Sequence, residues 1–277
     1  MIENVLRINS TIPRLQPEIE LPLTRVGRNH DGGYVVPSLV LENTTFLFSG
    51  GYGNDFSFEK DFLSKSKASS VFLYDFSITM LSLISDCLRS FISAALRRSH
   101  YPISYHLRNI LTYLQLKKTP RITLIHKKLS VVENSDKSKI TDLTSAFNSI
   151  STNDQELFFC KLDIEGSEYE LINELVILES RISGLVVEFH DTYSRRATFI
   201  NSLHSLSGSY AVVHTHVNNY GGISIDGQPK VYEISLLNRR FLSNLTALDR
   251  PNKSLVPLDQ PNDPDSAEVE LIFKSSS

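Results

Sequence analysis

Residues 49–59 read SGGYGNDFSFE and follow the apolar run TFLF at 45–48. Glycines that leave a predicted strand and enter a predicted helix allow a ligand to approach the backbone closely. Gly51 and Gly53 could open the dinucleotide fingerprint G-x-G-x-x-G, but Phe56 stands where the third glycine belongs. The stretch therefore predicts a ligand at a strand-to-helix bend, and the neighbouring residues indicate the chemical class of that ligand.

Carboxylates surround the bend. Asp55 and Glu59 lie in or near the first turn of the predicted helix, where a pyrophosphate would meet two acids. A cationic ammonium, such as that of the methionine end of S-adenosylmethionine, would instead pair with them. Asp75 ends the next predicted strand, where a carboxylate commonly accepts hydrogen bonds from ribose hydroxyls in nicotinamide and S-adenosylmethionine enzymes alike. Simple helix and turn caps are the alternative for these acids.

Apolar β-prone runs alternate with helical patterns along the chain, which predicts a parallel sheet covered on both faces. The predicted strands are 46–48, 71–74, 122–125, 157–164, 185–189, 210–217 and 231–237. A chain of 277 residues with 41% hydrophobic composition fits one large α/β domain with embellishments. We expect an N-terminal arm and hairpin over 1–44, the main domain over 45–240 and an irregular C-terminal tail over 241–277.

An inserted helical pair is predicted at about 78–120. Apolar residues recur at helical spacing from Met80 to Ala95, and a second helix fits 104–116. One interpretation is a packing element through which the chain forms a homo-oligomer. The other is a lid in which Arg97, Arg98 and His100 touch an anionic substrate.

Charge and cysteine content narrow the classes of partner. The formal net charge of -3 gives no field to hold nucleic acid or an anionic membrane. Cys87 and Cys160 lie in apolar runs and form no disulfide framework, which favours a reducing compartment. The N-terminus lacks a signal pattern, and no apolar run approaches the roughly 20 residues of a membrane span. We expect a cytoplasmic protein with no nucleic-acid partner and no integral membrane segment.

Four motifs occur in the order of one known family: SGGYGNDFSFE, Tyr74-Asp75, KLDIEGSEYELI at 161–172 and VVEFHD at 186–191. With them the chain resembles the FkbM-like class I methyltransferases, which use S-adenosylmethionine. The pattern R-x-G-x-N-x-D-G-G-Y at 25–34 and HVNN at 216–219 are similar to the branch found among bacterial surface-polysaccharide enzymes. KLDIEG is the most specific piece. Many relatives read D-x-G-A-N-x-G, whereas here Ser49 replaces the leading acid.

The resemblance implies a Rossmann-like class I methyltransferase sheet of seven strands, the last antiparallel, and an O-methyltransferase acting on a hydroxyl of a sugar or surface-polysaccharide precursor. A nicotinamide-dependent sugar-modifying oxidoreductase and a non-catalytic binding module are the alternatives. The residues assigned to the cofactor S-adenosylmethionine are Gly50, Gly51, Tyr52, Gly53, Asp55, Glu59, Asp75, Phe76, Ser130 and Asp163.

Polar residues close several predicted strands, where doubly wound sheets bind their ligands. Asp163 and Glu165 follow 157–162, whereas His190 and Asp191 follow 185–189. We predict catalytic roles for Asp163, His190 and Asp191. His190 could be a general base for the acceptor hydroxyl, oriented by either aspartate. Alternatively Asp163, His190 and His216 hold a divalent cation, and such a mixed N/O set suits manganese or zinc better than magnesium.

Two further polar groups are predicted to bind the acceptor. One group precedes the sheet and the other closes the run 210–217; together they comprise Arg28, Asn29, His30, Asp31, His216, Asn218 and Asn219. A turn held by local hydrogen bonds is the alternative for the first group, and structural hydrogen bonding is the alternative for the histidine.

Overall fold

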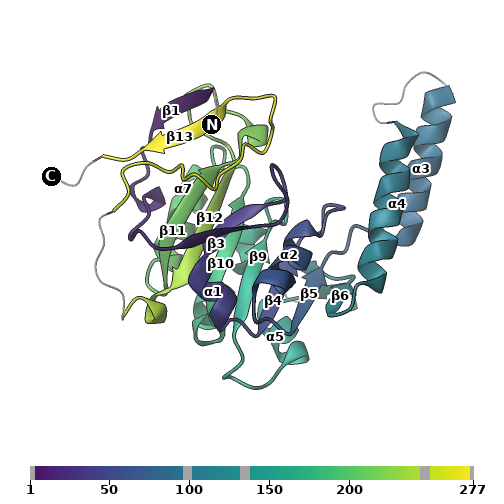
Figure 1. Cartoon of the computed structure of the whole chain (residues 1–277), viewed down its shortest axis with the longest axis horizontal. Helices are drawn as coiled ribbons and strands as arrows, with labels where there is room; N and C mark the ends of the chain where they lie inside the picture. The colour runs from purple at the N-terminus through teal and green to yellow at the C-terminus, as the bar shows by residue number, and fades with distance from the viewer. Residues whose placement is uncertain (1–3, 96–101, 132–137, 244–249, 275–277) are drawn as a thin grey trace.

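The computed structural model describes residues 4–95, 102–131, 138–243 and 250–274 (Figure 1). Seven strands form the central sheet: β4 (Phe46–Gly50), β5 (Ser70–Tyr74), β6 (Ile122–Ile125), β9 (Phe158–Leu162), β10 (Ile182–Phe189), β11 (Tyr210–Val217) and β12 (Tyr232–Asn238). Their order is β11-β12-β10-β9-β4-β5-β6, and β12 alone among these seven runs antiparallel to the others. Each strand overlaps a predicted apolar run, so the predicted Rossmann-like sheet with an antiparallel last strand is confirmed.

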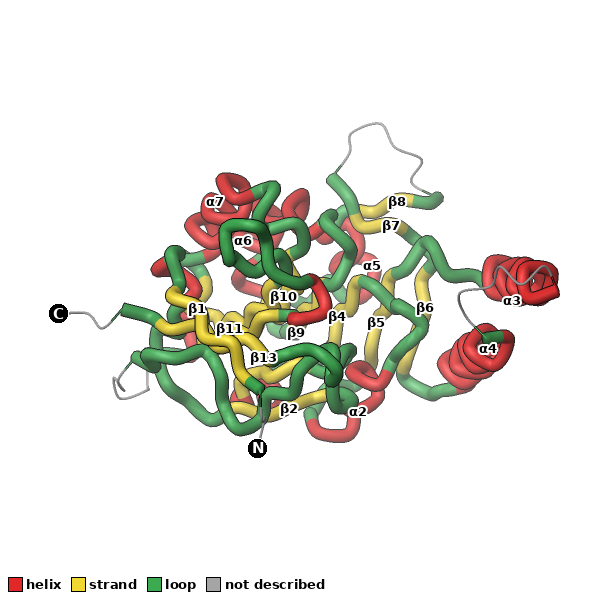
Figure 2. Tube along the Cα trace, turned by 90° about the horizontal axis from the view of Figure 1, so that it is seen from above, coloured by secondary structure: helices red, strands yellow, loops and turns green. Residues whose placement is uncertain are grey.

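Helices cover both faces of this sheet (Figure 2). The helices on one face are α5 (Leu143–Ile150), α6 (Ile172–Ile177) and α7 (Arg196–Leu206), whose apolar sides share one core cluster with Phe158 and Phe189. The other face carries α1 (Ser38–Asn43) and α2 (Ser57–Lys65), which pack with Phe159 into a second cluster. The strands are buried on both sides, which explains their nearly continuous apolar sequences.

The predicted hairpin is present. Strands β2 (Leu23–Val26) and β3 (Tyr34–Pro37) pair antiparallel around the tight turn at Asp31-Gly32-Gly33. The hydroxyl of Ser235 on β12 donates to the carbonyl oxygen of Val35, so β3 lies directly over the sheet. The hairpin is therefore part of the main body and brings the segment 27–33 toward the ends of the central strands.

The C-terminal tail is more regular than predicted, because β13 (Glu268–Ile272) pairs parallel with β1 (Val5–Asn9). Val269 and Leu271 of β13 are buried in the same cluster as the central sheet. The prediction of an irregular tail over 241–277 is wrong here, since this strand is stabilised by a partner at the opposite end of the sequence. Residues 250–266 are irregular, as expected.

The insertion between β5 and β6 forms the predicted pair of helices, α3 (Met80–Ala95) and α4 (Ile103–Lys118), which projects from one edge of the body (Figure 1). Large apolar side chains on α3 are exposed, among them Leu81, Leu88 and Phe91. The predicted lid residues Arg97, Arg98 and His100 lie outside the described residues. None of the described helices has the length and apolar character needed to cross a bilayer.

The remaining elements are short. They are the parallel pair β7 (Lys128–Leu129) and β8 (Ile140–Thr141) and the 3-10 helices η1 (Pro13–Leu15), η2 (Glu168–Leu171), η3 (Glu179–Arg181), η4 (Asn219–Gly221) and η5 (Arg239–Phe241).

Candidate active site

A cavity of about 300 Å³ opens where β4, β5 and β9 end. Six of the residues assigned from sequence to the cofactor or to the strand ends line it: Gly51, Gly53, Asp75, Phe76, Asp163 and Glu165. This edge holds the carboxyl ends of the parallel strands, which is where doubly wound sheets place their ligands. The sequence prediction of a ligand near the glycine bend thus coincides with a real concavity.

The three glycines of the bend have different surroundings. Gly51 has a φ of +91°, and a β-carbon there would lie 1.8 Å from the carbonyl oxygen of Asp163. A β-carbon at Gly50 would meet Leu129 at 2.9 Å, so protein atoms cover that position. Gly53 has a φ of +53° and open space around it. Protein atoms therefore cover the β-carbon positions of Gly50 and Gly51, and the bend has free space at Gly53.

Asp75 joins the bend to the next strand. Its Oδ2 accepts a hydrogen bond of 2.9 Å from the backbone N–H of Tyr52, and its Oδ1 accepts one of 2.7 Å from the N–H of Ser77. Oδ1 also accepts from the hydroxyl of Ser77 at 2.7 Å and from the N–H of Ile78 at 3.3 Å, so Oδ2 is the oxygen that keeps a lone pair for a ligand in the cavity that Asp75 lines. The cap and the ribose contact, stated above as alternatives, are therefore compatible. Phe76 beside it exposes 58% of its surface and offers an aromatic face.

A smaller cavity of about 60 Å³ adjoins the first and shares Gly53 and Asp163 with it. Charges of both signs line it: Arg28 and Lys161 on one hand, and Asp31, Asp55, Glu59 and Asp163 on the other. Asp55 and Glu59, assigned to the cofactor from sequence, thus face this space rather than the larger cavity. Such a mixture of charges is suited to a zwitterion.

Lys161 is the buried cation of the smaller cavity. It exposes 6% of its surface, and its Nζ donates one long hydrogen bond, 3.3 Å, to the carbonyl oxygen of Gly51. Nζ also lies 3.6 Å from Oδ2 of Asp163. Burial alone would lower the pKa of Lys161, but Asp163 and Glu59 outweigh it and raise the pKa above its ordinary value. The ammonium is therefore charged and has donors to spare for a ligand.

Asp163 also belongs to a buried hydrogen-bond network. The hydroxyl of Tyr34 lies 3.0 Å from Oδ2 of Asp163 and 2.8 Å from Oε2 of Glu188. Asn218 donates to Oε1 of Glu188 at 2.8 Å. Burial and the charges of Asp163 and Glu233 raise the pKa of Glu188 well above its ordinary value. One phenolic proton cannot donate to two carboxylates at once, so Asp163 and Glu188 share the Tyr34 hydroxyl as a common donor.

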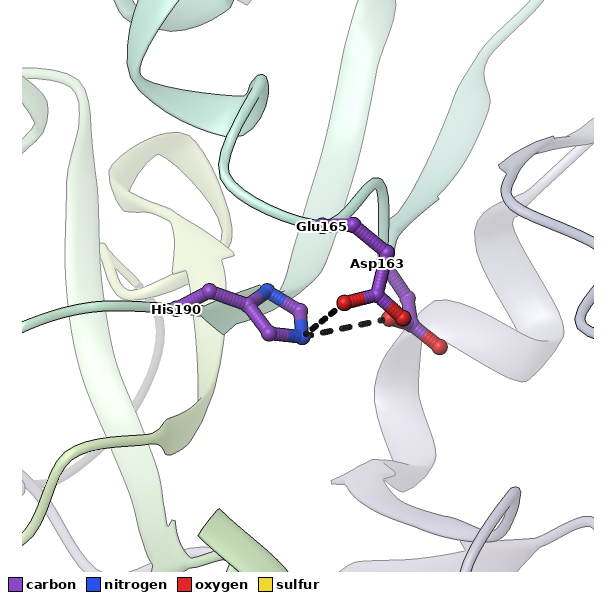
Figure 3. A group of neighbouring side chains, drawn as sticks. All are labelled: Asp163, Glu165 and His190. Carbon is purple, nitrogen blue, oxygen red and sulfur yellow. Dashed lines mark ion pairs between the residues drawn. The ribbon is translucent and has the colours of Figure 1, made fainter.

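His190 follows β10 and faces the carboxylates of Asp163 and Glu165 (Figure 3). Its Nε2 lies 3.5 Å from Oε2 of Glu165 and 3.9 Å from Oδ1 of Asp163. Although burial lowers the pKa of His190, the contact with Glu168 and the charges of Glu188 and Asp163 raise it to about 9. At neutral pH the imidazole is protonated and has no lone pair to accept a proton, which counts against His190 as the general base.

His216 is not part of this group. Its Nδ1 lies 2.9 Å from Glu233 and its Nε2 lies 3.3 Å from Glu268, so both nitrogens have carboxylate partners. The predicted metal set with His216 is therefore wrong, and a role in acceptor binding is not supported either. Asn219 hydrogen-bonds both ways with the backbone of Asp263, which makes it an anchor for the C-terminal loop.

Other predicted site residues lie apart from the cavities. The hydroxyl of Ser130 is buried and donates to Glu170 at 2.7 Å, so this residue was wrongly assigned to the cofactor. Asp191 is exposed at a turn with a φ of 53° and is not in the group of His190. Its predicted catalytic role therefore lacks support in the geometry.

The polar cluster before β3 divides in two. Arg28 forms ion pairs with Asp31 at 3.5 Å and with Asp55 at 3.3 Å, and all three residues line the smaller cavity. His30 turns the other way, and its Nδ1 lies 2.8 Å from the carbonyl oxygen of Pro261. Asn29 is exposed and lines neither cavity. Local hydrogen bonds thus hold part of this turn, and Arg28 and Asp31 lie at the smaller cavity, while the predicted contact with the acceptor stays a prediction.

Sequence reasoning gave no role to two residues of the site. Tyr34 ends the motif D-G-G-Y, which was used only as a resemblance. Lys161 stands inside a strand whose five residues are all buried. A charged residue in such a strand needs a partner or a ligand, and this was the signal that could have identified it.

No known family matches the chain, and no curated protein matches it. Among solved structures, 23S rRNA methyltransferase ErmE matches with a TM-score of 0.38 and 9% identity over 72% of this chain and 63% of that one. Precorrin-6y C5,15-methyltransferase from Geobacter metallireducens matches with a TM-score of 0.36 and 13% identity over 73% and 84% of the two chains. An rRNA methylase from Streptococcus thermophilus matches with a TM-score of 0.36 and 11% identity over 73% of this chain and 90% of that one. The chain thus spans less than two thirds of the first of these proteins.

Proposed function

We propose that this protein is an S-adenosylmethionine-dependent O-methyltransferase of the FkbM-like type, with a hydroxyl of a sugar or surface-polysaccharide precursor as its acceptor. One observation carries the proposal: a cavity of about 300 Å³ beside Asp75 adjoins a small cavity whose walls bear charges of both signs. The cofactor has the same two parts, an adenosine and an amino-acid zwitterion. The acceptor class rests on the motif resemblance.

The residues that would hold the cofactor follow from this division. Oδ2 of Asp75 would accept a hydrogen bond from a ribose hydroxyl, and Phe76 would cover the adenine, since both residues line the larger cavity. Past Gly53, Lys161 would bind the carboxylate of the methionine end, and Asp55 or Glu59 its ammonium. Bound S-adenosylmethionine would supply a methyl group for in-line attack by an acceptor oxygen, with S-adenosylhomocysteine as the leaving group. The chain's task is alignment of the acceptor with that methyl group.

The acidic charges of the site favour a sugar acceptor over RNA and over a pyrophosphate-containing cofactor. Asp163 and Glu165 line the larger cavity, where their carboxylates can accept hydrogen bonds from sugar hydroxyls. A polyanion such as RNA would meet these acids and a chain of net charge -3. A pyrophosphate would meet Asp55 and Glu59 at the bend.

We also propose a cytoplasmic location, because Cys87 and Cys160 are both free thiols.

Calorimetry with three ligands tests the proposal. S-adenosylhomocysteine carries the amino-acid end, 5′-methylthioadenosine lacks it, and NAD represents the rival cofactor. We expect the first two to bind and NAD to bind far more weakly. Lys161→Met should weaken S-adenosylhomocysteine about tenfold or more, because a charge-assisted hydrogen bond is worth about 1.5–3 kcal/mol. Binding of 5′-methylthioadenosine should stay unchanged in this variant.

The matched control is Lys60→Met, an exposed lysine on α2 that lines neither cavity. It should bind all three ligands as the unaltered chain does. Tighter binding of NAD than of S-adenosylhomocysteine would overturn the methyltransferase proposal. Equal loss of both adenosine ligands in Lys161→Met would overturn only the assigned position of the methionine end.

A further inference from the structure

Asp163, Glu165 and His190 form a compact group (Figure 3), and the two acids line the larger cavity. The two acids come from the segment after β9, and the histidine directly follows β10. One ligand atom of each residue lies within 4.8 Å of those of the other two. We propose that these three side chains bind a divalent cation of the manganese or zinc type.

The separations fit an ion better than hydrogen bonds. Nε2 of His190 lies 3.5 Å from Glu165, 3.9 Å from Asp163 and 3.6 Å from Glu188. Hydrogen bonds from a ring nitrogen to oxygen measure about 2.7–3.2 Å, so all three distances are too long. Two ligand atoms that each lie about 2.1 Å from one ion are at most about 4.2 Å apart. The distances from Nε2 to the two other proposed ligands, Glu165 and Asp163, fall within that limit.

The charges around the group are unbalanced. Four carboxylates, those of Asp163, Glu165, Glu168 and Glu188, lie within 3.9 Å of the ring nitrogens of His190. Among the described residues, Lys161 is the one lysine or arginine paired with any of these four acids, at 3.6 Å from Asp163. A divalent ion bound at Nε2 would displace the proton of the imidazole and add one positive charge among these acids.

The other ring nitrogen supports the same assignment. Nδ1 of His190 is buried and has no hydrogen-bond partner among the described residues, and Oε1 of Glu168 lies 3.5 Å from it. The carboxylate of Glu168 is fixed by the backbone N–H groups of Gly166 and His190. Histidines that bind metals commonly donate their second N–H to such a carboxylate, which orients the ring. A small rotation of the ring would complete that pair.

The donor set indicates the class of ion. One imidazole nitrogen with two carboxylate oxygens suits manganese or zinc, whereas magnesium and calcium favour oxygen alone. The role of the ion rests on the proposed function: Asp163 and Glu165 line the cavity where the acceptor must meet the methyl group. A cation there would polarise the acceptor hydroxyl and ease loss of its proton to solvent as the oxygen–carbon bond forms and the sulfur–carbon bond breaks. His216 has no part in it.

Metal binding can be measured without cofactor or acceptor. The full chain is stripped with EDTA and titrated with MnCl₂ while electron paramagnetic resonance reports the free ion. We expect one saturable site, weakened about tenfold or more in Glu165→Gln and in His190→Gln. The Glu165 side chain is 86% exposed, so its substitution leaves the fold intact. Asp154→Asn is the control, since Asp154 is an exposed acid that precedes β9 at the opposite end of the strand.

Two results would overturn the site: no saturable binding in the unaltered chain, or wild-type affinity in Glu165→Gln. Calorimetry with S-adenosylhomocysteine on the same samples separates this outcome from failure of the proposed function. If S-adenosylhomocysteine binds and manganese does not, the metal-site proposal is wrong and the methyltransferase proposal stands. If manganese binds and S-adenosylhomocysteine does not, the metal site stands and the methyltransferase proposal is wrong.

Discussion

Asp163 connects the parts of the site at the scale of single residues. Its carboxylate lines both cavities, accepts from Tyr34 and lies near Lys161 and His190. Its position after an apolar strand made it recognisable from sequence. The partners of His216 were not recognisable, because Glu268 lies 52 residues away in a strand that no pattern predicted.

Tyr34→Phe should lower the free energy of unfolding by about 1–3 kcal/mol, because it leaves buried acceptors of Asp163 and Glu188 without their donor. Urea denaturation measures the change. Tyr52→Phe is the matched control: the Tyr52 hydroxyl is buried without a hydrogen-bond partner among the described residues, so its loss should be neutral or slightly stabilising. Equal effects of the two substitutions would contradict the network.

His216 should make stability depend on pH. Burial lowers its pKa, but Glu233, Glu268 and Asp259 outweigh this and raise it well above 6.5. A group whose pKa is raised on folding stabilises the fold fully below its unfolded value and loses that contribution as the pH rises through the folded value. The free energy of unfolding should therefore fall from neutral to alkaline pH more steeply than in His216→Gln. Parallel profiles would show that the imidazole is not held as a cation.

At the scale of elements, the bend after β4 decides whether a ligand can bind. Gly51→Ala places a β-carbon 1.8 Å from a backbone oxygen, whereas Gly53→Ala meets only the cost of its φ of +53°. That cost is about 1–2 kcal/mol. We expect Gly53→Ala to fold with a modestly lower melting temperature and Gly51→Ala to be clearly less stable. A thermal melt that ranks them in the opposite order would contradict the geometry of the bend.

The seven central strands were predictable because burial on both faces makes most of their residues apolar, as in β4 and β9. The helices of the insertion were predictable from their helical spacing. β1 and β13 were not, since Glu268 and Glu270 alternate with apolar residues and the pairing joins the two ends of the chain. Ser130 was misassigned because its place in the sequence does not tell which way its side chain points.

At the scale of the whole molecule, the projecting helices leave an apolar surface uncovered. Leu81, Leu88 and Phe91 of α3 expose 80%, 60% and 64% of their surface, and Leu111 of α4 exposes 59%. Scattered exposed leucines are common, but such a row on one projecting element is typical of an interface. The predicted homo-oligomer through these helices stays a prediction.

Light scattering after size exclusion tests it. We expect a dimer that Leu88→Glu shifts toward monomer, because a charge would enter an apolar interface. Ile177→Glu is the control, since Ile177 on α6 is 73% exposed and lies outside the insertion. A monomer at every protein concentration would contradict the predicted interface.

The most direct test of the central claim is a crystal structure with S-adenosylhomocysteine. The account predicts its ribose hydroxyls on Asp75 and its carboxylate on Lys161, with the sulfur near Asp163. A ligand that binds away from the bend, or a phosphate held at Gly53 in its place, would contradict it.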